Sequence, residues 1–131
     1  MPGNGADVSE YKSKKLVDID MPQFAKVNTE KLFEGYKADE DKDPWHLMPW
    51  DSLRGIVKVL AFGSRKYTDR NWEKGMAWSR PYSALMRHLT SWWEGESKDA
   101  ETGYSHLWHA GCCILFLIAF EIRGTGTDDR P

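Results

Sequence analysis

Two carboxylates and two histidines stand close together in the C-terminal half of the sequence, at spacings suited to binding a metal ion. Glu96 and Asp99 are three residues apart, as are His106 and His109. Each pair continues the apolar stripe of a predicted helix, so we expect these side chains to face the interior. Unpaired carboxylates are costly to bury, and a bound cation would compensate them. The pattern predicts one metal site formed by these four residues.

A short connection between two predicted helices would bring the two pairs together. Pro81 suits the first turn of a helix, which we predict to run to about Asp99. After the connection AETGY, a further helix is predicted from Tyr104 or Ser105 to Ile122. Two helices joined by a short turn form an αα-hairpin. We therefore expect the carboxylates and the imidazoles to converge at this turn.

The ligand types indicate which ion would bind and what it would do. Carboxylate oxygens favour hard ions such as Mg²⁺, and imidazoles shift the preference toward Mn²⁺ or another transition metal. Such an ion lowers the pKa of its bound water and bridges phosphate oxygens. Glu94 and Glu101 flank the site, and either could be a further ligand or a base. Taken singly, each carboxylate could instead be a solvated surface group, and each histidine a core residue that hydrogen-bonds to the backbone. For His88, a structural and a functional role are equally open.

A basic and aromatic segment, GSRKYTDRNWEKGMAWSR at residues 63–80, has no sustained periodicity. A long loop in a small domain is typically functional, and its aromatic content argues against disorder. Arg and Lys side chains bind phosphates, aromatic rings stack on bases, and an Asn amide both donates and accepts. A solvated basic loop with core aromatic residues is the alternative. The predicted substrate-binding residues are Lys66, Tyr67, Asn71, Trp72 and, on the following helix, Arg87.

The remaining pattern is helical and shows neither internal repeats nor strand periodicity. A first helix is predicted from Trp50 to Phe62, ended by Gly63. The last helix is apolar nearly all round, so we expect it to be central and buried. The sequence therefore predicts an all-α protein, a compact helical bundle. Its helical domain covers residues 44–123, between a polar N-terminal extension at 1–43 and a polar tail at 124–131.

Length and charge suit a single domain that acts on a small molecule. The chain has 131 residues with 18 basic and 20 acidic side chains, which is unlike the basic footprint of a duplex-binding protein. The N-terminus lacks a signal-peptide pattern, and the apolar run Ala110 to Phe120 is too short to span a bilayer. The adjacent Cys112 and Cys113 lie in that run, which indicates reduced core thiols. We expect a cytoplasmic protein without stable nucleic-acid or membrane partners.

Several motifs together resemble those of one known family. They are FGSRKYTDRNWEKG at 62–75, RHL at 87–89, GESKDAETGYSHLWHA at 95–110 and, more weakly, GYKADEDKDPWHLMPW at 35–50. The chain resembles the phage-type (MazZ-like) dATP/dGTP diphosphohydrolases, which are related to the MazG-like all-α NTP pyrophosphatases. The resemblance covers roughly residues 35–118.

The resemblance implies a reaction that spacing alone does not supply. Members cleave a purine deoxynucleoside triphosphate between the α- and β-phosphates, which gives the monophosphate and pyrophosphate. In some phages they supply dGMP for diaminopurine-containing DNA and remove competing purine triphosphates. MazG-like relatives use Mg²⁺ or Mn²⁺ and form dimers or tetramers, so the resemblance implies a homodimer or homotetramer here.

Individual positions carry the resemblance over to this chain. Glu96 and Asp99 match a Gly-Glu-x-x-Asp motif, and the two histidines after them match His-Leu-x-His. Asp43 intervenes where the family has Lys-Pro directly, and Cys113 replaces a polar residue, so neither region is assigned a role. The paired carboxylate motifs of MazG itself are not both present.

These observations give one prediction and one alternative. The prediction is a metal-dependent hydrolase of dGTP, dATP or both, which acts in nucleotide-pool control or in modified-purine DNA synthesis, in the host cytoplasm if phage-encoded. Its catalytic residues would be Glu96, Asp99 and Glu101, with Mg²⁺ or Mn²⁺ as cofactor. The alternative is a non-catalytic nucleotide-binding or sensor module with the same pocket.

Overall fold

The computed structural model describes residues 34–131, so most of the predicted N-terminal extension lies outside the described residues. The chain divides into two units, at residues 1–46 and 47–131. The described part of the first unit is exposed to solvent, and the boundary between the units falls within a 3₁₀ turn, η2 (Trp45–Leu47). The second unit contains all of the residues predicted to bind metal or substrate.

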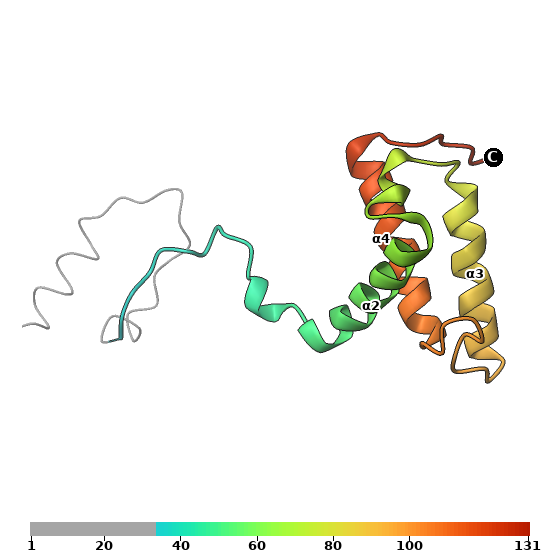
Figure 1. Cartoon of the computed structure of the whole chain (residues 1–131). Coiled ribbons are helices and arrows are strands. Elements are labelled where there is room, and N and C mark those ends of the chain that lie inside the picture. The colour runs from blue at the N-terminus through green and yellow to red at the C-terminus, as the bar shows by residue number, and fades with distance from the viewer. Residues whose placement is uncertain (1–33) are drawn as a thin grey trace, which may run out of the picture. The chain divides into compact units, whose positions relative to one another are not determined.

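Three α-helices form the second unit, and the last of them is central. Helix α4 (His106–Arg123) packs along α3 (Ser79–Trp93) and is crossed by α2 (Trp50–Tyr67), as Figure 1 shows. A short 3₁₀ helix, η3 (Asn71–Lys74), also contacts α4. Across residues 34–131, β-structure is limited to two isolated bridges. The all-α prediction is therefore confirmed.

The crossing of α2 over α4 depends on two glycines. A Cβ atom at Gly55 would lie 2.6 Å from the indole of Trp108, and one at Gly111 would lie 2.8 Å from Ile56. Any larger residue at these positions would push the two helices apart. The resulting core is small, and its buried apolar side chains are Val59, Ala110, Cys112 and Phe120.

Helix α2 is longer than the sequence predicted. The expected end at Gly63 is wrong, because the helix continues to Tyr67, where the Thr68 N–H donates to the Ser64 carbonyl. Gly63 does not adopt the left-handed conformation that would stop a helix there. Arg65 and Lys66 occupy the last turn, where cations complement the helix dipole. The segment after the helix is correspondingly shorter than the loop predicted at 63–80.

Helix α3 begins earlier and ends earlier than predicted. It starts at Ser79 and ends at Trp93, so the predicted extension to Asp99 is wrong. The physical reason is Gly95, whose φ of +101° lies in the region that favours glycine and interrupts the helix. Glu96 and Asp99 therefore do not share a helical face. They lie in the α3–α4 connection, which we define as residues 94–105.

Helix α4 agrees with the sequence in its bounds and its central position. The Ser105 side chain caps it by accepting from the Leu107 N–H, and left-handed Gly124 ends it. By length and composition α4 could also cross a membrane, since its mean hydropathy is 1.3, a property that central helices of bundles share. It is not buried on all sides as predicted, because one apolar stripe is exposed in the single chain. This exposed α4 stripe consists of Leu107, Ile114, Ile118 and Ile122.

The residues after α4 fold back onto the start of α3. In this C-terminal strap, residues 124–130, the Thr127 carbonyl accepts from the Trp78 N–H, and the Thr127 N–H donates to Met76. The Asp129 carboxylate accepts from the backbone N–H and hydroxyl of Ser79, and so caps α3 from fifty residues away. The strap approaches closely at Gly126, where a Cβ atom would lie 2.3 Å from the Met76 carbonyl oxygen.

Candidate functional site

Backbone hydrogen bonds fix the α3–α4 connection although it is not helical. The Glu96 N–H donates to the Ser91 carbonyl at 2.9 Å, which ties the start of the connection to α3. The Asp99 N–H donates to Tyr104 at 2.8 Å, and the His106 N–H donates to Ser97 at 3.0 Å. The two carboxylates therefore have defined positions at the end of the helix pair.

The four residues predicted to bind metal are brought together in two carboxylate–imidazole pairs. Glu96 Oε1 lies 3.4 Å from His106 Nε2, and Asp99 Oδ2 lies 3.8 Å from His109 Nε2. Neither pair is joined by a hydrogen bond, although both are close enough to count as ion pairs if the imidazole is charged. The convergence expected from spacing is present, although a turn rather than a helix supplies the carboxylates.

A third imidazole, that of His88 on α3, joins the predicted pair. Its Nδ1 lies 2.8 Å from Nδ1 of His106, and its ring stacks on that of His109 with centroids 4.6 Å apart and planes at 10°. Three of the four histidines in the chain thus form one histidine cluster, His88, His106 and His109. The signal for His88 in the sequence is weak, namely its position beside the apolar stripe of α3.

Thr102 connects the second carboxylate to the cluster. Its backbone N–H donates to Asp99 Oδ2 at 3.1 Å, and its hydroxyl lies 3.2 Å from the same oxygen. The hydroxyl also lies 2.7 Å from His109 Nε2. Thr102 therefore orients both a carboxylate and an imidazole, and sequence reasoning missed it because no spacing rule singles out a threonine in a turn.

The surroundings favour the neutral imidazole at His88 and His109 and the charged carboxylate at Asp99. Burial, followed by the neighbouring imidazoles, lowers the pKa of His88. Burial also lowers the pKa of His109, although the negative charge of Asp99 acts to raise it. Partial burial of Asp99 acts to raise its pKa, but the bonds from Thr102 and the nearby His109 outweigh it and lower that pKa. Neutral imidazole and ionised carboxylate are the forms that bind metal ions.

One atom of the cluster lacks a partner. His106 is 5% exposed, and its Nε2 is the sole buried side-chain nitrogen or oxygen without a hydrogen bond within residues 34–131. Leaving such a group unpaired costs about 1–3 kcal/mol. A ring nitrogen that faces a carboxylate without bonding to it is suited to receive a ligand from outside the chain.

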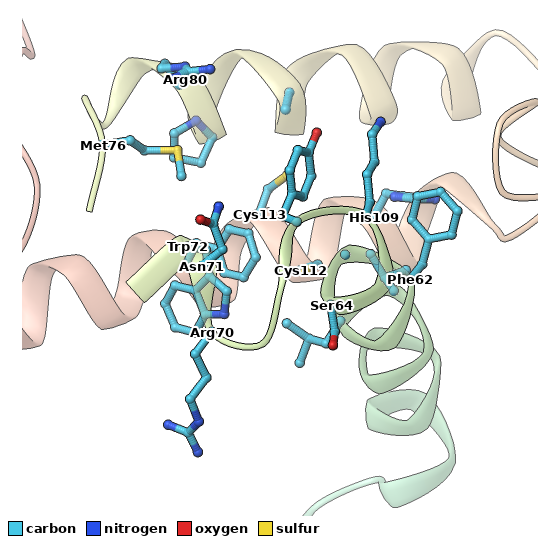
Figure 2. Close-up of a pocket in the computed structure, with 18 of the residues that line it drawn as sticks. Phe62, Ser64, Arg70, Asn71, Trp72, Met76, Arg80, His109, Cys112 and Cys113 are labelled. Carbon is cyan, nitrogen blue, oxygen red and sulfur yellow. The ribbon is translucent and has the colours of Figure 1, made fainter. Parts of the chain in front are cut away.

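A large pocket adjoins the histidine cluster. Its volume is about 1070 Å³, and it lies between the end of α2, η3, α3 and α4. Figure 2 shows Asn71 and Trp72 of η3 at one side of this pocket and His109 of α4 at the other. Glu101 of the connection also contributes to its lining. All five residues predicted to bind substrate line the same pocket: Lys66, Tyr67, Asn71, Trp72 and Arg87.

The pocket combines cations with aromatic rings. Lys66 Nζ donates to Glu101 Oε1 at 2.6 Å, which raises the pKa of Lys66 and links the end of α2 to the connection. Trp72 stacks on Phe116 with ring centroids 4.4 Å apart, so one face of its indole is already used within the protein. The two cysteines also line the pocket, and burial raises the pKa of the Cys112 thiol to about 12. That thiol is therefore protonated at neutral pH and unsuited to nucleophilic chemistry.

The comparisons with known proteins identify one family. Residues 34–130 match the family model described as dATP/dGTP diphosphohydrolase, N-terminal. The chain is 31% identical over 96 residues to a dATP/dGTP diphosphohydrolase of Salmonella phage PMBT28, a match that covers 73% of this chain. It spans about a third of the length of that relative. No solved structure matches the chain. Because the family model covers most of the sequence, including the histidine cluster and the pocket, the chain belongs to the dATP/dGTP diphosphohydrolase family, of which it carries the N-terminal domain.

Proposed function

We propose that this chain hydrolyses dGTP, dATP or both to the nucleoside monophosphate and pyrophosphate, and that it depends on a divalent metal ion. The observation that supports this most directly is the meeting of two sites at His109, which lines the basic and aromatic pocket and belongs to the histidine cluster. His109 and Glu101 line the pocket, whereas Glu96, Asp99 and His106 do not, so phosphates in the pocket would approach the cluster at His109. The activity named for the phage relative is consistent with this arrangement.

The residues present fit a divalent cation. Glu96 and Asp99 offer carboxylate oxygens, and His106 offers a ring nitrogen. With His109, these are the ligands that we propose for Mg²⁺ or Mn²⁺. When bound, such an ion polarises phosphate oxygens and lowers the pKa of a coordinated water.

The pocket side chains would bind and orient the substrate. Lys66 and Arg87 would neutralise the phosphates, while Tyr67, Asn71 and Trp72 would hold the purine base. Trp72 is already stacked on Phe116, so a base would meet its edge or its remaining face.

Glu101 would take the proton of the attacking water. Water attacks the α-phosphorus, the bond to the bridging oxygen breaks, pyrophosphate leaves, and a carboxylate accepts the proton released by the water. In the free protein Glu101 is held by Lys66 at 2.6 Å. A polyphosphate that competes for Lys66 would release the carboxylate, so substrate binding and activation of the base would be coupled.

Product analysis tests this proposal. The full chain is incubated with each of the eight common ribo- and deoxynucleoside triphosphates, with Mg²⁺ or Mn²⁺, and the products are resolved by chromatography. We expect monophosphate and pyrophosphate from dGTP or dATP. His109→Ala should abolish turnover, whereas His46→Ala, which changes the one histidine outside the cluster, should not. Absence of turnover with either metal would refute the hydrolase, and binding without turnover would instead support a nucleotide sensor.

The exposed α4 stripe supports a further part of the proposal, a homodimer or homotetramer. Ile118 is 49% exposed and Ile122 is 78% exposed in the single chain, and contiguous apolar surface of this kind is typical of subunit interfaces. Light scattering coupled to size exclusion would measure the mass. Ile118→Glu should shift an oligomer toward monomer, and a wild-type monomer at micromolar concentration would contradict this part of the proposal.

A further inference from the structure

We propose that His88 is a further imidazole ligand of the metal site, binding through Nδ1 together with Nδ1 of His106 and with Asp99, and that the site prefers a borderline transition ion such as Mn²⁺, Co²⁺ or Zn²⁺ over Mg²⁺. The inference rests on the metal site of the proposed function, but it does not depend on the reaction or on the nucleotide. It adds a ligand from α3 to a set that the α3–α4 connection and α4 otherwise supply.

The spacing of the donor atoms is the first argument. His88 Nδ1 and His106 Nδ1 are 2.8 Å apart. Two nitrogens that bind one ion at about 2.1 Å and at a right angle to each other lie about 3 Å apart. His88, Asp99 and His106 also offer three donor atoms that all lie within 4.8 Å of one another. Ligands on opposite sides of one ion are about 4.2 Å apart at the same bond length, so this set needs only small side-chain movements to close on an ion.

The second argument is that the ring of His88 is already held in place. It stacks on His109 with the two planes at 10°. His109 is itself held by the hydroxyl of Thr102, which lies 2.7 Å from its Nε2. His106 is buried, and its backbone N–H is bonded to Ser97. Rings fixed by packing and by hydrogen bonds form a prearranged ligand set, which reduces the entropy lost on binding.

A hydrogen bond between the two imidazoles is the competing explanation, and it accounts for less. One proton shared between the Nδ1 atoms of His88 and His106 would explain their separation. It would account for these two nitrogens alone and not for the approach of Asp99, whose carboxylate lies within 4.8 Å of a donor atom of each ring. A cation between the three side chains would bring both nitrogens and this carboxylate into favourable contact at once.

The ligand types decide the class of ion. Two imidazoles with one carboxylate form a nitrogen-rich set, which suits borderline transition ions. Mg²⁺ prefers oxygen ligands in near-ideal octahedral geometry and retains several waters, so a site dominated by imidazoles discriminates against it. The preference for the transition ion therefore depends on His88, because this residue makes nitrogen the majority donor.

Metal binding without nucleotide tests the inference. The full chain is treated with EDTA, dialysed, and titrated with Co²⁺ by absorption spectroscopy and with Mn²⁺, Zn²⁺ and Mg²⁺ by calorimetry. We expect one class of Co²⁺ site with visible d–d bands, and clearly weaker binding of Mg²⁺. His88→Ala should reduce Co²⁺ affinity by at least about 10-fold and alter the bands, since loss of a supporting group commonly has an effect of this size. His46→Ala is the matched control and should bind as the wild type does.

His88→Gln separates a ligand from a hydrogen-bonding role, and it also serves if the alanine variant does not fold, as judged by circular dichroism. An amide can hydrogen-bond to His106 but is a poor ligand. Affinity should remain low in His88→Gln if His88 binds the ion. Wild-type affinity in either variant, or Mg²⁺ binding as tightly as Co²⁺ in the wild type, would overturn the inference while leaving the hydrolase intact. If the wild type binds none of these ions, the metal site of the proposed function fails as well.

Discussion

The two ends of the α3–α4 pair are both closed by polar segments, and they differ in how completely their polar groups are paired. At the strap end, the Asp129 carboxylate accepts from Ser79, and the Trp78 indole N–H donates to the Thr125 carbonyl at 2.9 Å. At the connection end, His106 Nε2 has no partner, and Glu96 approaches it without a hydrogen bond.

The difference separates a structural role from a functional one. Native structures pair nearly all of their buried polar groups, so an unpaired one requires an explanation. The strap satisfies its polar groups within the chain and thereby holds the η3–α3 segment, which includes the pocket residue Met76. At the connection end, by contrast, His88, Asp99 and His106 offer donor atoms that all lie within 4.8 Å of one another. Variants at the connection should therefore change ligand binding and activity, and variants at the strap should mainly change stability.

The largest expected effect is on turnover, at the connection. Asp99→Asn keeps an oxygen that can accept from the Thr102 N–H but removes the negative charge beside His109. We expect turnover of dGTP or dATP to fall by more than about 100-fold with little change in thermal stability, because metal sites are sensitive to their charge. Asp129→Asn at the strap is the matched control, with turnover within a few-fold of wild type. Similar losses in both variants would erase the contrast between the two ends.

The second effect is stabilisation by metal. An ion that binds only the folded protein stabilises it by about 2.7 kcal/mol at one hundred times its dissociation constant. We therefore expect Mn²⁺ to raise the melting temperature of the wild type and EDTA to reverse the change. The increment should persist in Asp129→Asn and disappear in Asp99→Asn. Its presence in Asp99→Asn would show that the ion binds elsewhere.

The third effect is on stability, at the strap. Gly126→Ala places a Cβ atom 2.3 Å from the Met76 carbonyl oxygen at a φ of +78°, so it combines a clash with backbone strain. We expect a loss of about 1–3 kcal/mol, measured by urea unfolding. Gly124→Ala is the control, since its φ is +63° but nothing lies within 4 Å of the added atom. Equal losses in the two variants would mean that strain alone, and not the close approach of the strap, determines the cost.

The smallest effect is the response of the strap to acid. The bonds from Ser79 lower the pKa of Asp129, so the strap is fully held above the ordinary carboxyl pKa of about 3.9 and is released as pH falls through the lower value of the folded state. The NMR signal of the Trp78 indole N–H, which is bonded within the strap, should report this release. Asp129→Asn should remove the acid transition, and an unchanged titration would contradict the assignment.

Much of the architecture could be predicted from the sequence. The apolar periodicity of the last helix predicted α4 nearly to the residue, because the Ser105 and Gly124 caps that set its ends in the structure are local. The predicted ends of the other helices were wrong at Gly63 and beyond Trp93. Glycine permits a left-handed conformation without requiring it, so Gly63 remained helical while Gly95 ended its helix.

The candidate site, too, could be predicted from the sequence only in part. Residue types and spacing determined that Glu96, Asp99, His106 and His109 would converge, because any short connection between adjacent helices brings its flanking residues together. Only the tertiary structure decided that His88 joins them, since the packing of α3 along α4 brings it near residues eighteen and twenty-one positions away.

The strap and the pairing of polar groups were likewise decided by tertiary structure. Nothing local to GTGTDDRP indicates that Asp129 caps a helix fifty residues earlier, because such a contact depends on where α4 ends relative to the start of α3. Sequence determined the chemistry that is available: imidazoles, carboxylates and the basic and aromatic side chains of the pocket wall. Packing decided which polar groups satisfy one another and which, like Nε2 of His106, remain without a partner.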